Sequence, residues 1–206
     1  MLLLVGLGNP GAEYAHSRHN AGFRVIERLV REWKLGPDRA RFQGITNDGS
    51  IGGEKIVALR PQTHMNESGR SVGAAVRFFK LEPNDVIVFH DEADLEFGKL
   101  RWKTGGGSAG NNGIKSVTAH ITDAYHRLRI GVGRSESAAM RSHVLGDFSK
   151  AEGAEIDKLI EAIVKNADLL AARDYERYMS KLALTTNPPR NAGPKKSREP
   201  DDEDDT

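Results

Sequence analysis

The sequence has no cysteine among its 206 residues, and long hydrophobic runs are also missing. Disulfide bonds and thiolate chemistry are therefore excluded, which fits a reducing, cytoplasmic compartment. No apolar stretch approaches the roughly 20 residues that a membrane-spanning helix needs, so we expect no membrane partner. Met1 leads directly into an apolar stretch, and no signal peptide is expected before the fold.

A strong net charge is absent as well. The 30 basic and 29 acidic residues give a formal net charge of +1. Residues 187–206 contain four basic and six acidic side chains, which leaves 26 basic and 23 acidic residues in 1–186, about +3. This mildly basic body is compatible with a polyanionic partner. Residues 187–206 are rich in proline and charge, and they predict a disordered tail after one domain over residues 1–186.

The pattern of apolar residues predicts an α/β fold. Strands are predicted over 1–5, 41–47, 54–59, 86–89, 99–103 and 128–132, with Asn47-Asp48-Gly49 as a hairpin turn. Helices are predicted over about 20–33, around Val72 and Val76, from about 114, from 150, and over 174–182. Because helices alternate with strands, we expect a single domain with a twisted mixed β-sheet and helices on both sides.

Glycines follow the first predicted strand in the pattern Gly6-x-Gly8-x-x-Gly11. This is the form of the dinucleotide-binding fingerprint, in which a helix opens on the glycines. Here Pro10 and a polar loop intervene, and no acidic residue ends a following strand at the expected spacing. A nucleotide-dependent enzyme stays open as an alternative.

Polar side chains occur where strands are predicted to end, which is where α/β proteins place their chemistry. Asp91 could accept a hydrogen bond from one imidazole nitrogen of His19, leaving the other nitrogen to take a proton from water. Asparagine amides could donate to a carbonyl or accept from a peptide N–H. No serine lies in a Gly-x-Ser-x-Gly elbow, so water would be the nucleophile and a hydrolase is the hypothesis. The candidate residues are His19, Asp91, Asn9, Asn66 and Asn112.

Structural roles and a metal site are the alternatives for these residues. Asn9 could cap a turn, and Asn66 could be a helix N-cap. His16 and His19 are spaced as a pair of metal ligands, and the acidic cluster at 91–94 could hold a cation. A metal site needs three or four ligands together, and no third histidine partner follows from the spacing. We therefore predict no metal ion and no cofactor.

Six motifs occur in a fixed order between residues 1 and about 184. They are Val5–Gly11 with Tyr14 and Arg18-His19-Asn20, then Arg60–Gly69, His90–Leu95, Gly105–Gly113, Arg129–Arg134 and Val144–Phe148. Together they resemble the bacterial-type peptidyl-tRNA hydrolases. The resemblance covers nearly all of the chain before the tail.

The resemblance implies hydrolysis of the ester that joins a nascent peptide to the 3′ ribose of tRNA, which releases tRNA for translation. It implies a monomeric, metal-free enzyme in which His19 is the general base and Asp91 is its partner. The residues implied to bind the peptide and the 3′ end are Asn9, Tyr14, Met65, Asn66 and Asn112. The basic positions implied at tRNA phosphates are Lys103 and Arg134.

One departure from the family pattern lies beside the site, because Asn111 stands where the family commonly has histidine. The departure leaves the role of Asn111 open, with consequences for pH dependence or for the motion of the Gly105–Gly113 loop. Lys103 and Arg134 could also be ordinary solvated charges. A non-catalytic RNA-binding relative of the same fold is the main alternative to the enzyme.

Overall fold

A computed structural model describes residues 1–134 and 139–186, so the predicted tail over 187–206 lies outside the described residues. The strands form one sheet in the order β2-β3-β4-β1-β5-β7-β6. The four central strands are mutually parallel: β4 (Glu54–Pro61), β1 (Leu2–Gly6), β5 (Val86–Glu92) and β7 (His126–Gly131). The antiparallel strands are β2 (Arg39–Arg41), β3 (Gly44–Ile51) and β6 (Leu100–Thr104).

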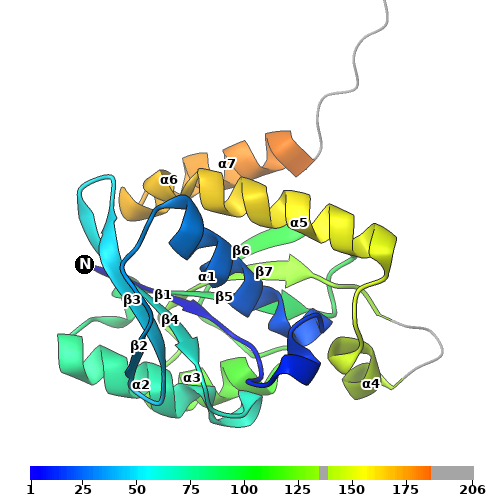
Figure 1. Ribbon diagram of the computed structural model, residues 1–206, viewed down its shortest axis with the longest axis horizontal. Coiled ribbons are helices and arrows are strands. Elements are labelled where there is room, and N and C mark those ends of the chain that lie inside the picture. The colour runs from blue at the N-terminus through cyan, green and yellow to red at the C-terminus, as the bar shows by residue number, and fades with distance from the viewer. Residues whose placement is uncertain (135–138, 187–206) are drawn as a thin grey trace, which may run out of the picture.

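Helices cover both faces of this sheet (Figure 1). One face packs against α1 (Ala21–Glu32), α5 (Lys150–Lys165), α6 (Ala167–Ala171) and α7 (Tyr175–Thr186). The other face packs against α2 (Ser68–Phe79) and α3 (Asn112–Ile121). The remaining helices are α4 (Met140–Leu145) and the short 3₁₀ helices η1 (Ala12–Tyr14), η2 (Arg18–Asn20), η3 (Met65–Glu67) and η4 (Pro83–Asp85).

The central strand β1 shows why its sequence is apolar throughout. Leu2 and Leu4 belong to the core on the α1 side, whereas Leu3 and Val5 belong to the core on the α2 side. Alternate side chains of a strand point to opposite faces, so a strand covered on both faces needs apolar residues at every position. The predicted α/β class, with a twisted mixed sheet and helices on both sides, is confirmed.

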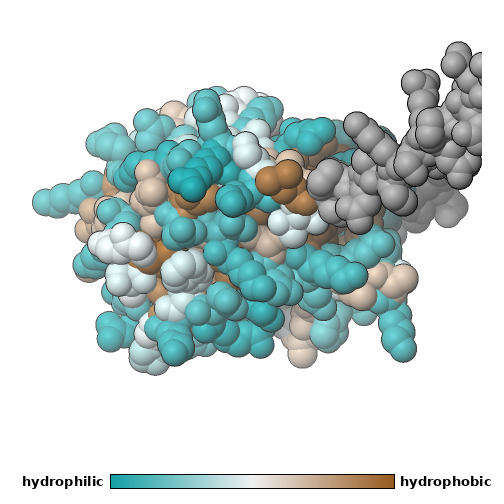
Figure 2. All heavy atoms as spheres, turned by 90° about the horizontal axis from the view of Figure 1, so that it is seen from above, coloured by the Kyte–Doolittle hydropathy of each residue, from teal (hydrophilic) through white to brown (hydrophobic). Residues whose placement is uncertain are grey.

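The C-terminal helices are amphipathic, as the sequence predicts. In α5 the predicted apolar stripe is buried against the sheet side of the molecule, and it includes Ile156, Leu159, Ile160, Ile163 and Val164. The outer face above these helices is mostly hydrophilic, with small separate hydrophobic patches (Figure 2). Among residues 1–134 and 139–186, none of the helices has the length and hydrophobicity of a membrane-spanning segment.

The predicted hairpin turn at Asn47-Asp48-Gly49 is wrong, because these residues lie inside β3. The Asn47 side chain is buried, and its Nδ2 donates to the carbonyl oxygen of Gly36 and to Asp38 Oδ1, both at 2.8 Å. These bonds join segments about ten residues apart, and they outweigh the local turn preference of the sequence.

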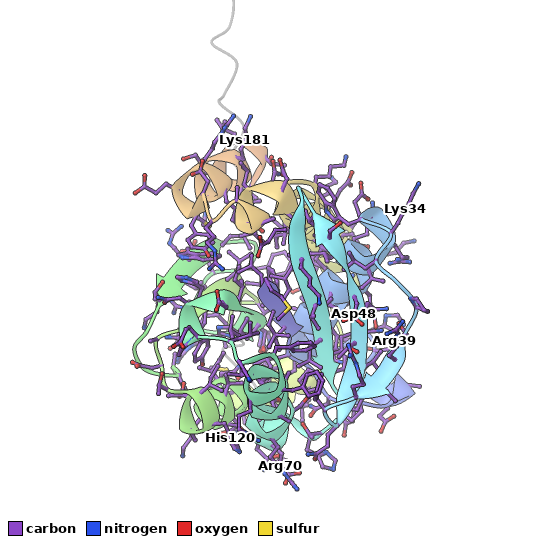
Figure 3. The ribbon with its side chains drawn as sticks, turned by 90° about the vertical axis from the view of Figure 1, so that its left-hand side faces the viewer. Lys34, Arg39, Asp48, Arg70, His120 and Lys181 are labelled. Carbon is purple, nitrogen blue, oxygen red and sulfur yellow. The ribbon has the colours of Figure 1, made fainter. Side chains whose placement is uncertain are left out.

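Asp48 is likewise held within the sheet. Its carboxylate accepts from Arg41 Nη2 at 2.8 and 2.9 Å and lies 3.5 Å from Arg39, the cation labelled beside it in Figure 3. The chain reverses instead at 42–43 and at 52–53, where all four residues have positive φ. Three strands therefore occupy the region where two were predicted.

The glycines of the Gly6-x-Gly8-x-x-Gly11 pattern allow close packing between β1, the loop after it and α1. A Cβ on Gly6 would lie 2.2 Å from the carbonyl oxygen of Gly22, and one on Gly8 would lie 2.6 Å from the ring of Phe23. The helix α1 begins at Ala21, far beyond the glycines. The geometry of a dinucleotide fingerprint, in which the helix opens on the glycines, is therefore not present.

Replacing Gly6 by alanine is expected to destabilise the fold, because the new methyl group would collide with the backbone of Gly22. We expect Gly6→Ala to lower the free energy of unfolding by about 1–3 kcal/mol. The matched control is Gly153→Ala in α5, where a Cβ meets nothing within 4 Å. The control should be neutral or stabilising by up to about 1 kcal/mol. Urea unfolding measures both, and equal midpoints for the two variants would contradict the close packing at Gly6.

Candidate active site

The carboxyl ends of the four parallel strands meet at one edge of the sheet, and the segments that follow them enclose a cavity of about 760 Å³. Open α/β sheets bind ligands at this edge. Nearly all of the predicted site residues line the cavity: His19, Asp91, Asn9, Tyr14, Met65, Asn66, Asn112 and Arg134. Lys103 does not line it.

His19 and Asp91 are in direct contact within the cavity. The distance from His19 Nδ1 to Asp91 Oδ1 is 2.8 Å. His19 lies in η2, immediately before α1, and Asp91 lies in β5, which continues three residues beyond the predicted strand to Glu92. Asp91 is only 2% exposed, so bulk water hardly solvates its carboxylate. A carboxylate can only accept, so His19 Nδ1 carries the proton and Nε2 is left as the acceptor.

The surroundings of His19 change its proton affinity in two opposite ways. Burial lowers the pKa of His19, whereas the negative charge of Asp91 and its hydrogen bond raise it. The effect of Asp91 is the larger in sum, and the pKa of His19 lies above the ordinary histidine value of 6.5. The contact therefore makes His19 a stronger base than a free histidine.

Asn9 is positioned by Asn20, a buried residue that follows His19 in the sequence. Asn20 Oδ1 accepts from the Asn9 backbone N–H at 2.8 Å, and Asn20 Nδ2 donates to the Asn9 carbonyl oxygen at 2.9 Å. Asn9 Oδ1 in turn accepts from the backbone N–H of Met65 at 2.9 Å. Asn9 therefore connects two distant segments of the chain, which differs from the alternative of a local turn cap. Its Nδ2 has no hydrogen-bond partner among residues 1–134 and 139–186.

Asn66 and Asn112 present their amides from different segments of the cavity wall. Asn66 is exposed within η3, and the N-cap of α2 is Glu67, so the alternative that Asn66 caps this helix is wrong. Asn112 is the exposed first residue of α3. This helix starts two residues before the predicted position because Asn111 is its N-cap.

The glycine-rich segment before α3 is held by a buried cation that the sequence analysis missed. Arg127, 2% exposed, donates to the carbonyl oxygens of Gly107 at 3.0 Å, Gly106 at 2.9 Å and Gly105. One guanidinium thus satisfies three consecutive carbonyl groups. The available signal was the alternation of arginine with Leu128 and Ile130 in β7. Since Leu128 and Ile130 face the α5 side, Arg127 faces the other side of the sheet.

The acidic cluster at the end of β5 is divided among three different partners. Asp91 contacts His19, Glu92 accepts from Arg129 Nε at 3.1 Å, and Asp94 pairs with Arg134. No group of three His, Asp or Glu side chains in the described ranges is arranged to hold a metal ion. Arg134 reaches the cavity from the end of β7, and its side chain is 64% exposed.

Part of the cavity wall comes from α4, a helix that the sequence analysis did not predict. With only six residues, α4 is too short for a reliable helical period. The spacing of Met140 and Val144, four residues apart, was the available signal. The cavity residues contributed by this helix are Met140, Arg141, Val144 and Leu145.

The family profile and the sequence relatives that match this chain carry the same description. The sequence profile described as peptidyl-tRNA hydrolase matches residues 3–191. The peptidyl-tRNA hydrolase of Parvibaculum lavamentivorans is 52% identical over 205 residues, with 98% of this chain and all of that protein covered. That of Beijerinckia indica is 54% identical over 183 residues, with 88% and 92% covered.

Solved structures agree with these sequence relatives. A crystal structure of peptidyl-tRNA hydrolase from Acinetobacter baumannii superimposes with a TM-score of 0.84 at 38% sequence identity, covering 88% of this chain and 94% of the other. The matched profile and the relatives both span most of the chain. The chain described here therefore belongs to the peptidyl-tRNA hydrolase family.

Proposed function

We propose that this chain, as an enzyme of the peptidyl-tRNA hydrolase family, hydrolyses the ester between a peptide or an N-blocked aminoacyl group and the 3′ ribose of tRNA. His19 is the general base in this proposal, and Asp91 orients it. The observation that carries the proposal is the 2.8 Å contact between His19 Nδ1 and Asp91 Oδ1 at the cavity. The reaction belongs to carboxylic ester hydrolysis, with water as the nucleophile and free tRNA as one product.

The proton movements follow from the orientation of the imidazole ring. His19 Nε2 takes a proton from water as the water oxygen attacks the ester carbonyl carbon. The imidazolium that forms is stabilised by the buried Asp91 carboxylate. Collapse of the tetrahedral intermediate breaks the bond to the ribose oxygen, and the proton on Nε2 passes to that leaving oxygen. The neutral His19 is then restored.

Amide groups around the base supply the contacts to the peptide part of the substrate. Asn9 Oδ1 is already occupied by the Met65 N–H, so its Nδ2 is available to donate to a substrate carbonyl. The exposed amides of Asn66 and Asn112 would bind peptide N–H and C=O groups, with Tyr14 and Met65 as cavity wall. Because these contacts are to backbone groups of the peptide, peptides of any sequence would bind.

The positions of Lys103 on β6 and of Arg134 after β7 support binding of the tRNA phosphates. Lys103 lies opposite Arg127, and Arg101 lies opposite Arg129, in the register of the two strands. Opposed residues of antiparallel strands share one face of the sheet, so the four cations lie on one side. Two of them have partners within the protein, because Arg127 is buried on the glycine-rich segment and Arg129 pairs with Glu92. Phosphate contacts from Lys103 and from the exposed Arg134 would add affinity without selecting particular bases. A monomeric state and a cytoplasmic location stay predictions.

The direct test is cleavage of N-acetyl-aminoacyl-tRNA by the wild type and by His19→Ala, with free aminoacyl-tRNA as the control substrate. We expect the wild type to cleave the blocked substrate, and we expect His19→Ala to lose about 10²–10⁴-fold in kcat, the usual contribution of a general base. Thermal unfolding checks that the variant is folded. Turnover near the wild-type rate in folded His19→Ala would remove His19 from the mechanism, and tRNA binding without any wild-type cleavage would favour a non-catalytic RNA-binding protein.

The phosphate contacts predict a change in the salt dependence of tRNA binding. Lys103→Ala and Arg134→Ala should each weaken binding, and each should reduce the slope of log K against log salt by about 1. The matched control is Lys34→Ala. Lys34 follows the C-terminus of α1, at the end of the helix opposite to His19, and it is labelled in Figure 3. A slope equal to that of the control variant would place Lys103 or Arg134 outside the binding surface.

A further inference from the structure

The side chain of Asn111 connects the catalytic carboxylate to the start of α3. Its Nδ2 donates to Asp91 Oδ1 and to the Asp91 carbonyl oxygen, both at 3.2 Å. Its Oδ1 accepts from the backbone N–H groups of Gly113 at 3.0 Å and Ile114 at 3.1 Å. These partners fix the orientation of the amide, because the reversed amide would place NH₂ against two donors and its oxygen against a carboxylate. Asn111 is only 9% exposed, so water does not easily replace either interaction.

Asn111 and His19 donate to the same oxygen atom of Asp91. The distances to Asp91 Oδ1 are 2.8 Å from His19 Nδ1 and 3.2 Å from Asn111 Nδ2. A donor on a carboxylate oxygen stabilises its negative charge and reduces the stabilisation that this charge gives to a nearby cation. The amide therefore opposes the interaction that makes His19 a stronger base.

Several ionisable groups near His19 contact other residues. Arg18 of η2 pairs with Glu152, and Arg24 of α1 pairs with Asp157. On β5, Glu92 pairs with Arg129. Burial lowers the pKa of His90 to about 4, and its Nδ1 contacts the Asp91 carbonyl oxygen. Within residues 1–134 and 139–186, other groups on the facing elements include Arg141 and His143 of α4, His64 before η3, and the pair of Asp94 with Arg134. His143 Nε2 lies 3.1 Å from the Val132 carbonyl oxygen.

We propose that Asn111 is a positioning residue that donates to the Asp91 oxygen bound by His19 and thereby moderates the stabilisation of the protonated imidazole. The inference deepens the proposed function and rests on it for its catalytic meaning. Because an amide does not titrate, Asn111 donates at every pH and adds no second ionisation to the pair. The same side chain caps α3, so Asp91 and the cavity residue Asn112 keep a fixed separation.

Two variants separate the donor from the cap. Asn111→Ser keeps an oxygen that can cap α3 but removes the donor to Asp91. Asn111→Asp keeps the size and the capping oxygen, and replaces the donor by a second negative charge. The direct measurement is a ¹⁵N-histidine NMR titration of the substrate-free protein, with the His19 signal assigned by its absence in His19→Ala.

We expect the titration midpoint of His19 to move to higher pH in Asn111→Ser by about half a pH unit, and to move at least as far in Asn111→Asp. The signal of His126, whose Nδ1 contacts Thr104, is the internal reference and should keep its midpoint. A purely structural role for the cap would leave the His19 midpoint unchanged in both variants. An unchanged midpoint in folded Asn111→Ser, or a midpoint moved to lower pH, would overturn the inference.

The activity measurement then distinguishes this inference from the proposed function. The acid limb of the pH–rate profile for N-acetyl-aminoacyl-tRNA cleavage should move to higher pH together with the NMR midpoint. Absence of cleavage by the wild type would reject the proposed function while the substrate-free titration still decides the role of Asn111. Normal wild-type cleavage with an acid limb that stays in place in Asn111→Ser would reject the role of Asn111 alone.

Discussion

The hydrogen bond between His19 and Asp91 depends on the close approach of α1 to strands β1 and β5. The parallel register pairs Gly6 with Phe89, and the Leu7 N–H continues the ladder to the Phe89 carbonyl oxygen at 3.0 Å. A Cβ on Gly22 would lie 2.3 Å from that same carbonyl oxygen, so only glycine allows the first turn of α1 to lie there. Since η2 leads directly into α1, this packing brings His19 to the end of β5.

The chemistry of the site follows from the balance between burial and charge. A buried imidazole alone would be a weaker base, and a buried carboxylate alone would be costly. Their contact removes both problems, because Asp91 stabilises the protonated ring and His19 satisfies the carboxylate. Asn111 supplies a neutral donor to the same oxygen. Glu92 and Asp94 have arginine partners of their own, so the adjacent carboxylates do not compete for His19.

Local patterns of apolar residues in the sequence predicted β1 from its continuous apolar run, and α1 and α5 from their helical spacing. They also placed His19, Asp91 and the asparagines at strand ends, and the parallel sheet brings these to one cavity. Features set by contacts between distant segments were not predictable in this way. Asn47 and Asp48 have turn character, but their partners in other segments hold them within β3. The helix α4 has too few residues to show a period. The bond from Asn111 to Asp91 spans 20 residues and requires the fold itself.

In the proposed reaction, Asp91 raises the basicity of His19 for proton removal from water. The most direct test is the pH dependence of single-turnover cleavage of N-acetyl-aminoacyl-tRNA, measured for the wild type and for Asp91→Asn. We expect the wild-type rate to rise with pH through a midpoint above 6.5, because the pKa of His19 is raised. In Asp91→Asn the rate should fall, and the midpoint should move below 6.5, because burial then acts on His19 without the compensating charge. The same midpoint in both proteins would show that Asp91 does not raise the basicity of His19.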